Sequence, residues 1–317
     1  MAAPYSDNDA ATVALRRYSE RVHPLYQQNV FGSDGGEVTS VPEKLIGQAI
    51  AQQVRDSEQR RNAVPRLPTI IPLLLRQLRD PNTSARDYVA VIKQDPVVAA
   101  AVLKIANSVY FNPYRKNVEN FEHAVATLGI EGLRLVLSTA VLQPIVRGQN
   151  SRLPQKIWDH SLACAVCCQQ LAERTHLDSF KAYLLGLVHD IGVVTLFNQL
   201  QLHSVEHLAG KAPSAELLTQ LVEQWSQPLA YWIAQDWQLP VEIVRALASQ
   251  QELSAANETA LSRILRRANC LSEAYLLMRA DLIEREELQK MAIALQCPAN
   301  LLQHLDDAFT DAIAQTR

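Results

Sequence analysis

Glycine and strand-type patterning are both scarce in this sequence of 317 residues, which contains only 10 glycines. Segments in which Val or Ile alternate with polar residues, as in half-buried strands, are almost absent. Leu, Ala, Gln, Glu and Arg dominate instead, and all are good helix formers. The sequence therefore predicts an all-α protein, large enough for one large or two modest globular domains.

An excess of charge and a long uninterrupted apolar run are also missing. Lys and Arg number 30 against 33 Asp and Glu, so the formal net charge is −3 and gives no reason to expect nucleic acid or a membrane surface as partner. No uninterrupted apolar run reaches the roughly 18–20 residues that span a bilayer, and the N-terminus lacks the pattern of a secretory signal. The five cysteines lie mostly in apolar helical sequence, as reduced thiols do, so we expect a cytoplasmic protein.

Apolar periodicity and helix-ending signals divide the chain into four parts. We expect an N-terminal helical extension over 1–60, with helices at 8–28 and 42–62. A bundle of short helices follows over 67–150, punctuated by Asp-Pro pairs at 80–81 and 95–96 and by a turn at 128–132. A second helical subdomain with longer apolar helices covers 151–285, and a C-terminal helical segment covers 286–317. We expect the extension to provide an additional protein or homodimer contact.

A His-Asp pair interrupts the apolar run LLGLVHDIGVVTL at 184–196. Burying His189 and Asp190 without partners would cost several kcal/mol. His160 lies 29 residues upstream in another apolar helix, and two antiparallel helices would bring the two histidines face to face. Two imidazoles and a carboxylate suit one divalent transition-metal ion. They also suit a metal-free buried polar network, and the sequence leaves both interpretations open.

Two sets of motifs make the chain recognisable. The H-x28-HD pattern in WDHSLACA and LLGLVHDIG resembles the HD superfamily of metal-dependent phosphohydrolases. Upstream, LPTIIPLLLRQLRDP, VIKQDPVVAAAVLKIANSVYF and AVATLGIEGLRLVLS resemble the HDOD family (HD-related output domain). The signature residues of the second segment are Asp95, Pro96, Ala106, Asn107 and Ser108. The resemblance covers about 67–285 and implies an all-α, HD-like bundle of two packed helical subdomains.

The resemblance also implies a set of metal ligands. HD enzymes hold metal through a first histidine, the HD pair and a distant aspartate, which correspond to His160, His189, Asp190 and Asn269. The last position departs from the family pattern, because an amide offers a neutral carbonyl in place of a carboxylate. In the metal-free interpretation, Asn269 completes the polar network.

Further departures affect the residues that the resemblance associates with catalysis. The extra histidines of two-metal members would fall near 225–227 and 249–251, where this chain has WSQ and SQQ. Val193 stands where active cyclic-dinucleotide phosphodiesterases often have a lysine. Since a two-metal site must clamp both the attacking and the leaving oxygen, three or four ligands for one ion fall short of it.

We therefore expect a non-catalytic bacterial signalling module with a degenerate HD site, which acts through signalling proteins. No cofactor is required, although one divalent metal ion could bind. Two alternatives stay open: a metal-dependent phosphohydrolase or cyclic-dinucleotide phosphodiesterase that uses His160, His189 and Asp190, and a nucleotide-binding sensor without hydrolysis.

Other polar and aromatic clusters favour structural roles. Cys164, Cys167 and Cys168 lack the second ligand pair of a zinc site and are expected to be buried thiols. His203 and His207 have metal-compatible spacing but are expected to be solvated.

Asn107 and Ser108 are expected to make helix-end hydrogen bonds. The following loop, 108–118, could form a recognition surface through its aromatic and basic residues. The spacing of the three tryptophans at 225, 232 and 237 favours core packing.

Overall fold

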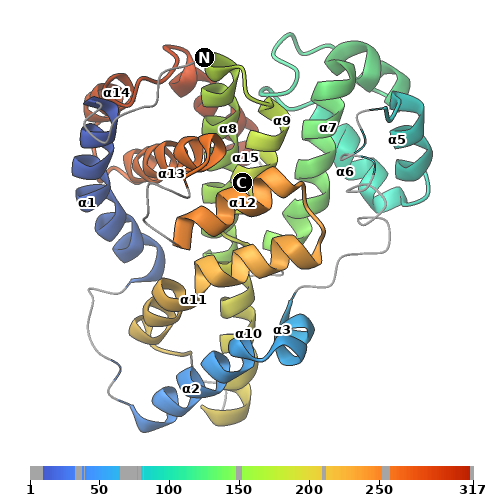
Figure 1. The fold of residues 1–317 in the computed structure, drawn as a ribbon. Coiled ribbons are helices and arrows are strands. Elements are labelled where there is room, and N and C mark those ends of the chain that lie inside the picture. Colours follow the sequence, from blue (N-terminus) through green and yellow to red (C-terminus); the bar gives the residue numbers. More distant parts are fainter. Residues whose placement is uncertain are drawn as a thin grey trace.

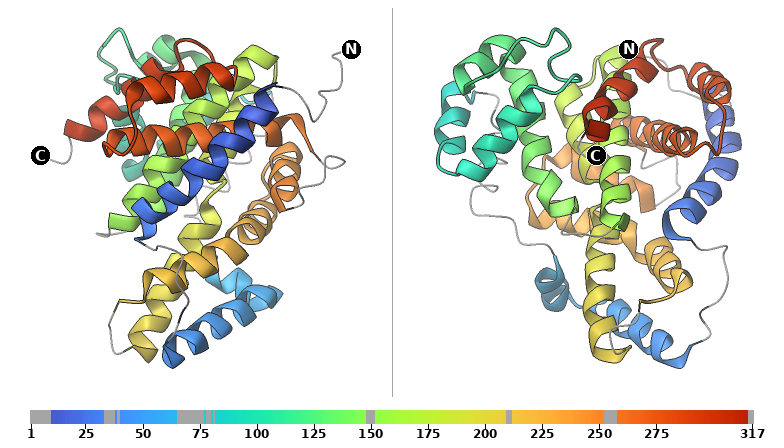
Figure 2. Two further views of the ribbon diagram at one scale, coloured as in Figure 1. Left: turned by 90° about the vertical axis from the view of Figure 1, so that its left-hand side faces the viewer. Right: turned by 180° about the vertical axis from the view of Figure 1, so that it is seen from behind.

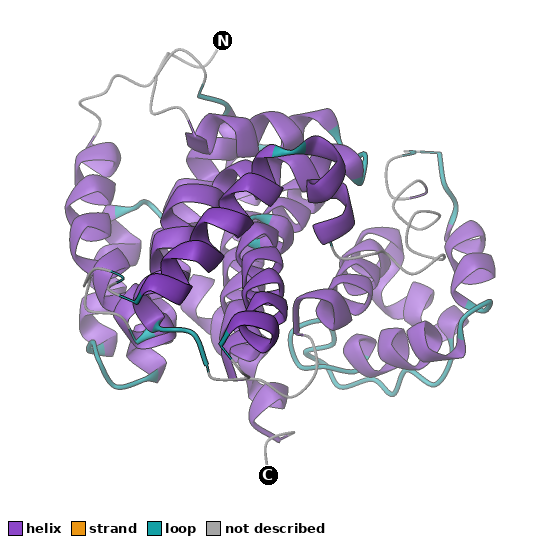
Figure 3. Cartoon of the chain, turned by 90° about the horizontal axis from the view of Figure 1, so that it is seen from below, coloured by secondary structure: helices purple, strands orange, loops and turns teal. Residues whose placement is uncertain are grey.

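The computed structural model describes residues 10–32, 38, 40–64, 77, 80, 82–147, 152–208, 212–251 and 258–314. Every regular element in these ranges is a helix, which confirms the all-α prediction (Figure 3). In chain order the helices are α1 (Ala10–Phe31), α2 (Val41–Arg55), α3 (Ser57–Ala63), α5 (Ala85–Ile92), α6 (Pro96–Ala106), α7 (Phe121–Arg147), α8 (Arg152–Thr175), α9 (Ser179–Val188), α10 (Ile191–His207), α11 (Ala215–Asp236), α12 (Val241–Gln251), α13 (Ala260–Arg279), α14 (Arg285–Ala294) and α15 (Leu301–Ala314).

Helix α8 forms the centre of the molecule, with α9 and α13 packed along it (Figure 1). The short helices α5 and α6 pack on α7, which in turn contacts α8 and α9. At the other end, α10 and α11 pack together and carry α2 (Figure 1). The middle of α8, 160–168, is buried on nearly every side, as a central helix surrounded by others is, and apolar residues make up most of it.

Local signals in the sequence explain several helix ends. Ser84 and Asp87 form a capping box at the start of α5. Asp95 caps α6 by accepting hydrogen bonds from two backbone amides, and Pro96 occupies the first turn. The turn predicted at 128–132 is a kink inside α7 at Gly129, whose φ of 66° favours glycine.

One helix prediction was wrong in detail, because the single helix expected over 42–62 breaks at Asp56, whose side chain caps α3. The apolar run at 184–196 is also interrupted, since α9 ends and α10 begins at the HD pair. The C-terminal segment forms two helices, α14 and α15. The start of the short-helix bundle, 67–81, lies almost wholly outside the described residues.

The N-terminal helices pack within the chain. Helix α1 runs along α13 and also contacts α8, α11 and α14 (Figure 2). Helix α2 lies across α10 and α11 and buries Ile46, Ile50 and Val54. These apolar faces are therefore used intramolecularly. The homodimer contact, like the domain boundaries drawn from the sequence, stays a prediction.

Two apolar helical stretches, Phe121–Val146 and Ser179–His207, have the length and composition to cross a membrane. Their most apolar windows are 50% and 78% buried inside the molecule, as core helices of soluble proteins also are. The second stretch is in addition broken at the HD pair. Composition alone is thus a weak indication of a membrane, and the cytoplasmic location stays a prediction.

Candidate functional site

The HD pair lies at the junction between α9 and α10. His189 is the C-terminal cap residue of α9, and Asp190 is the N-terminal cap residue of α10 without a capping hydrogen bond from its side chain. Two glycines allow close packing around the junction. A Cβ at Gly186 would overlap the backbone of α8, and a Cβ at Gly192 would overlap the Ser226 carbonyl of α11. The glycines thus let two neighbouring helices approach closely while the Asp190 side chain stays free for other contacts.

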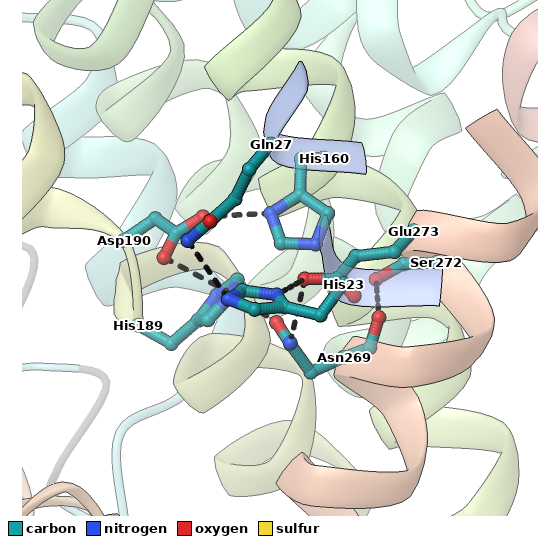
Figure 4. Close-up of polar contacts among 8 residues, drawn as sticks. All are labelled: His23, Gln27, His160, His189, Asp190, Asn269, Ser272 and Glu273. Atoms are coloured by element: carbon teal, nitrogen blue, oxygen red, sulfur yellow. Dashed lines mark hydrogen bonds and ion pairs between the residues drawn. The ribbon is translucent and has the colours of Figure 1, made fainter. Parts of the chain in front are cut away.

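The structure brings the four predicted site residues together (Figure 4). His160 Nδ1 donates to Asp190 Oδ2 at 2.6 Å. His189 Nδ1 donates to the Gly186 carbonyl at 2.8 Å, while His189 Nε2 lies 3.1 Å from Asn269 Oδ1 and 3.4 Å from Asp190 Oδ1. The two imidazole rings meet edge to face with centroids 5.1 Å apart.

The cluster contains a carboxylate and an imidazole that favour each other's charged form. Burial is the largest single effect on His189 and disfavours its charged form, but the Asp190 carboxylate and the Cys164 side chain together outweigh it, and the pKa of His189 is raised to about 9. The geometry agrees, because each ring nitrogen of His189 faces a carbonyl oxygen that can accept a hydrogen bond from an N–H group. Burial likewise opposes the charged Asp190, yet His189 and His160 hold its pKa well below the usual range.

Three residues that the sequence did not reveal extend this cluster. Asn269 Nδ2 donates to Glu273 Oε1 at 3.1 Å, and His23 Nδ1 donates to the same oxygen at 2.7 Å. Gln27 Nε2 lies 2.9 Å from His23 Nε2. A chain of polar contacts thus runs from His160 on α8 to His23 on α1 (Figure 4).

These residues line a cavity of about 260 Å³ between α1, α8, α11, α12 and α13. Its polar wall combines histidines with three carboxylates, those of Asp190, Glu223 and Glu273. Lys and Arg are missing from the described residues that line it. The Tyr26 ring of α1 covers His160, with ring centroids 4.9 Å apart.

The donor set fits one divalent transition-metal ion. Ligand atoms of His160, His189 and Asp190 all lie within 4.8 Å of one another. His160 Nε2 is buried and has no hydrogen-bond partner among the described residues, so a lone pair is available there. An ion bound to these residues would polarise a water or an oxygen of a ligand. To bind the ion, His189 would have to give up either the hydrogen bond from Nδ1 to the Gly186 carbonyl or the contact of Nε2 with Asn269.

The cysteines of α8 and the histidines of α10 were expected to have structural roles. The thiols of Cys164, Cys167 and Cys168 are fully buried, which confirms their core role. His203 and His207 stack with ring centroids 5.9 Å apart beside Glu206 on the last turns of α10. His207 is exposed but His203 is half-buried, so the prediction that both are solvated was wrong for His203.

The Asn107 side chain links the end of α6 to the following loop. Its amide donates to the carbonyls of Leu103 and Val118, and its oxygen accepts from the Val118 amide. The predicted helix-end role is therefore confirmed. Tyr110 is half-buried and donates to Gln169, so the recognition surface suggested for this loop reduces to its exposed tip, 113–117.

The tryptophans differ in burial. Trp225 and Trp237 are buried in the core, as expected, whereas Trp232 is half-buried beneath the guanidinium of Arg60. Cation–π stacking therefore accompanies core packing at this position.

Comparison with known families agrees with this fold. The sequence model of the HDOD domain matches residues 64–253. The chain belongs to the HDOD family. The matched range contains His160 and the HD pair, whereas α1, Asn269 and Glu273 lie outside it.

Two curated relatives of this HDOD chain are bacterial. A Treponema pallidum protein of uncharacterised function is 24% identical over 201 residues, which are 62% of this chain and 39% of that protein. The cyclic di-GMP phosphodiesterase CdgJ of Vibrio cholerae is 27% identical over 161 residues, 49% of this chain and 34% of that protein. The matches span well under half of either relative.

Solved structures share the fold. A protein of Shewanella amazonensis, named provisionally as a metal-dependent phosphohydrolase, aligns over 88% of this chain and 100% of its own with a TM-score of 0.60 and 19% identity. An HDOD domain protein of unknown function from Geobacter sulfurreducens aligns over 86% and 94%, with a TM-score of 0.56 and 19% identity. At these identities the likeness shows the fold alone.

Proposed function

We propose that this HDOD chain is a non-catalytic signalling module that acts through protein partners and does not turn over a phosphate ester. The observation that carries the proposal is the charge of the cavity. Asp190, Glu223 and Glu273 line it, while no Lys or Arg does so among the described residues. A phosphoryl group carries negative charge that enzymes stabilise with cationic side chains or several metal ions.

The positions that depart from the two-metal pattern lie on the same cavity. Ser226, Gln227 and Gln250 are part of its wall, in the two segments where the resemblance places the extra histidines. These side chains are neutral and are poor ligands for a second ion. A single ion at His160, His189 and Asp190 would leave one oxygen of a phosphoryl-transfer reaction without a clamp, which supports a non-catalytic role.

A metal-dependent phosphohydrolase or phosphodiesterase is the second candidate. It is favoured by the His160, His189 and Asp190 cluster and by the name of the Vibrio cholerae relative. The match covers 34% of that relative, so the activity in its name is not assigned to the matched part.

Metal analysis and turnover distinguish the two candidates. The purified chain is stripped with chelator, reloaded with Mn²⁺ or Zn²⁺, and assayed with p-nitrophenyl phosphate and cyclic di-GMP. We expect the wild type to show no more turnover than Asp190→Ala. His207→Ala is the matched control, because it removes a histidine from α10 without touching the cavity. Turnover abolished by Asp190→Ala and kept by His207→Ala would overturn the proposal.

The partners that we propose are cytoplasmic signalling proteins. A net charge of −3 gives no support to a nucleic-acid or membrane partner. Crosslinking in cells, with identification of the captured proteins, tests this part separately. Capture of membrane lipid or nucleic acid in place of protein would contradict it.

A further inference from the structure

We propose that α1 is a displaceable lid over the HD cavity, that the His23–Glu273 hydrogen bond is its latch, and that the HD pair controls the latch through Asn269. This inference concerns regulation of the site described above and rests on the proposed signalling role only for its biological use. Helix α1 lies outside the segment matched by the family.

The geometry places α1 across the cavity. His23, Tyr26, Gln27 and Phe31 all lie on its wall and come from the second half of the helix. Tyr26 covers His160. His23 reaches over to Glu273 on α13 (Figure 4). Removing α1 would therefore expose the cluster formed by the HD pair and His160.

Helix α1 is less deeply buried than the central helix. Of its 22 residues, Ala11, Val22 and Tyr26 are buried, whereas 14 of the 24 residues of α8 are buried. Further apolar side chains of α1 pack partly buried against the core, namely those of Ala14, Leu15, Tyr18, Leu25, Val30 and Phe31. Pro24 lies inside the helix and has no backbone N–H, so one helical hydrogen bond is missing in the turn that carries His23. A peripheral helix that is less buried than the central helices opens at lower free energy than they do.

Polar contacts add to this apolar packing. Arg21 pairs with Glu287 of α14, and the Lys156 ammonium of α8 donates to the Asn29 carbonyl. The His23–Glu273 contact differs from these two because the Glu273 side chain is only 3% exposed. If α1 leaves, Glu273 loses the one ion pair found for it among the described residues, and such a loss is costly for a buried carboxylate. This makes His23 the latch.

Asn269 connects the latch to the HD pair. Its Nδ2 holds the same Glu273 oxygen that accepts from His23, and its Oδ1 faces His189 Nε2. A change at Asp190 that turns or shifts His189 therefore reaches Glu273 through one amide. Turning the Asn269 amide around would exchange its oxygen and its nitrogen, and so would change the contacts with His189 and with Glu273 at the same time. The two contacts are therefore coupled.

Hydrogen exchange of backbone amides in the full-length chain tests the proposal. We expect His23→Ala to accelerate exchange in 10–31 at least tenfold, while the amides of α8 stay as protected as in the wild type. Asp190→Asn, at the far end of the polar chain, is expected to accelerate the same α1 amides. Arg16→Ala is the matched control on α1, because its exposed pair with Glu20 lies within the helix itself.

Two results would overturn the proposal. One is exchange of α1 at the rate of α8 in every variant, which would make α1 part of the global folding unit. The other is acceleration by His23→Ala but not by Asp190→Asn, which would leave a lid that is not coupled to the HD pair. Unchanged protection of α8 shows that the variants are folded. No partner or substrate enters the measurement, so its failure is distinct from failure of the proposed signalling function.

Discussion

Gly186→Ala tests whether close packing of α9 on α8 holds the HD pair in place. A Cβ at this position would lie 2.8 Å from the Cys164 carbonyl carbon and closer still to Ala165, whereas ordinary contact begins at 3.4 Å. Since the obstructing atoms are backbone, the two helices must separate by at least about 0.9 Å, because the added Cβ would lie 2.5 Å from the Ala165 nitrogen and ordinary contact begins at 3.4 Å. Overpacking of this kind costs up to about 3 kcal/mol, and the gain in helix propensity returns about 1 kcal/mol. We expect a net loss of about 2 kcal/mol in unfolding free energy.

Urea unfolding of the purified chain measures this loss, with Gly47→Ala as the matched control. Gly47 also lies inside a helix, but its added Cβ would meet only the flexible Leu217 side chain, at 3.2 Å. This control should therefore be neutral or more stable than the wild type by up to about 1 kcal/mol. Gly186→Ala as stable as Gly47→Ala would refute the idea that the HD junction depends on backbone contact between α8 and α9.

Three further predictions concern protonation, the amide bridge and the loop after α6. In chelator-treated protein, the raised pKa of His189 (about 9 when folded, about 6.5 when unfolded) stabilises the fold fully below pH 6.5, and this contribution is lost as the pH rises through 9. Urea unfolding between pH 6 and 10 should show the loss in the wild type and much less of it in Asp190→Asn. Asn269→Asp should lower metal-free stability by about 1–3 kcal/mol, because it places a second carboxylate against Glu273, and should raise Zn²⁺ affinity in calorimetry. A metal-free Asn269→Asp chain as stable as the wild type would contradict this account. Asn107→Ala should cost about 1–3 kcal/mol in urea unfolding through its lost backbone hydrogen bonds, whereas a change below about 0.5 kcal/mol would contradict its linking role.

The sequence predicted the helical fold from local signals, whereas the cluster of four site residues was predicted with the help of the family resemblance, which supplied Asn269. Apolar periodicity marks most helices, and Asp95 and Ser84 mark their starts. The break at the HD pair was missed because apolar residues continue on both sides of it and no proline marks the end of α9. The two glycines that flank the pair were a signal that neighbouring helices approach closely there.

The part played by α1 could not be read from local patterns. His23 and Glu273 are 250 residues apart in the sequence, and nothing in the periodicity of either helix links them. The one local hint was a pair of polar residues, His23 and Gln27, on either side of Pro24 inside an otherwise amphipathic helix. Such a cluster is unremarkable on a solvated face, so only the tertiary structure assigns it to the site.

Asn269 shows why a residue that departs from the family pattern can be required by this structure. In the HD enzymes this position holds a carboxylate ligand, which Asn269 lacks. In the fold, it faces an imidazole donor on one side and the Glu273 carboxylate on the other. An ionised aspartate can only accept hydrogen bonds, so it could satisfy His189 but would repel Glu273. An amide can satisfy both, which makes Asn269 the residue type that joins the HD pair to the α1 latch in a metal-free network.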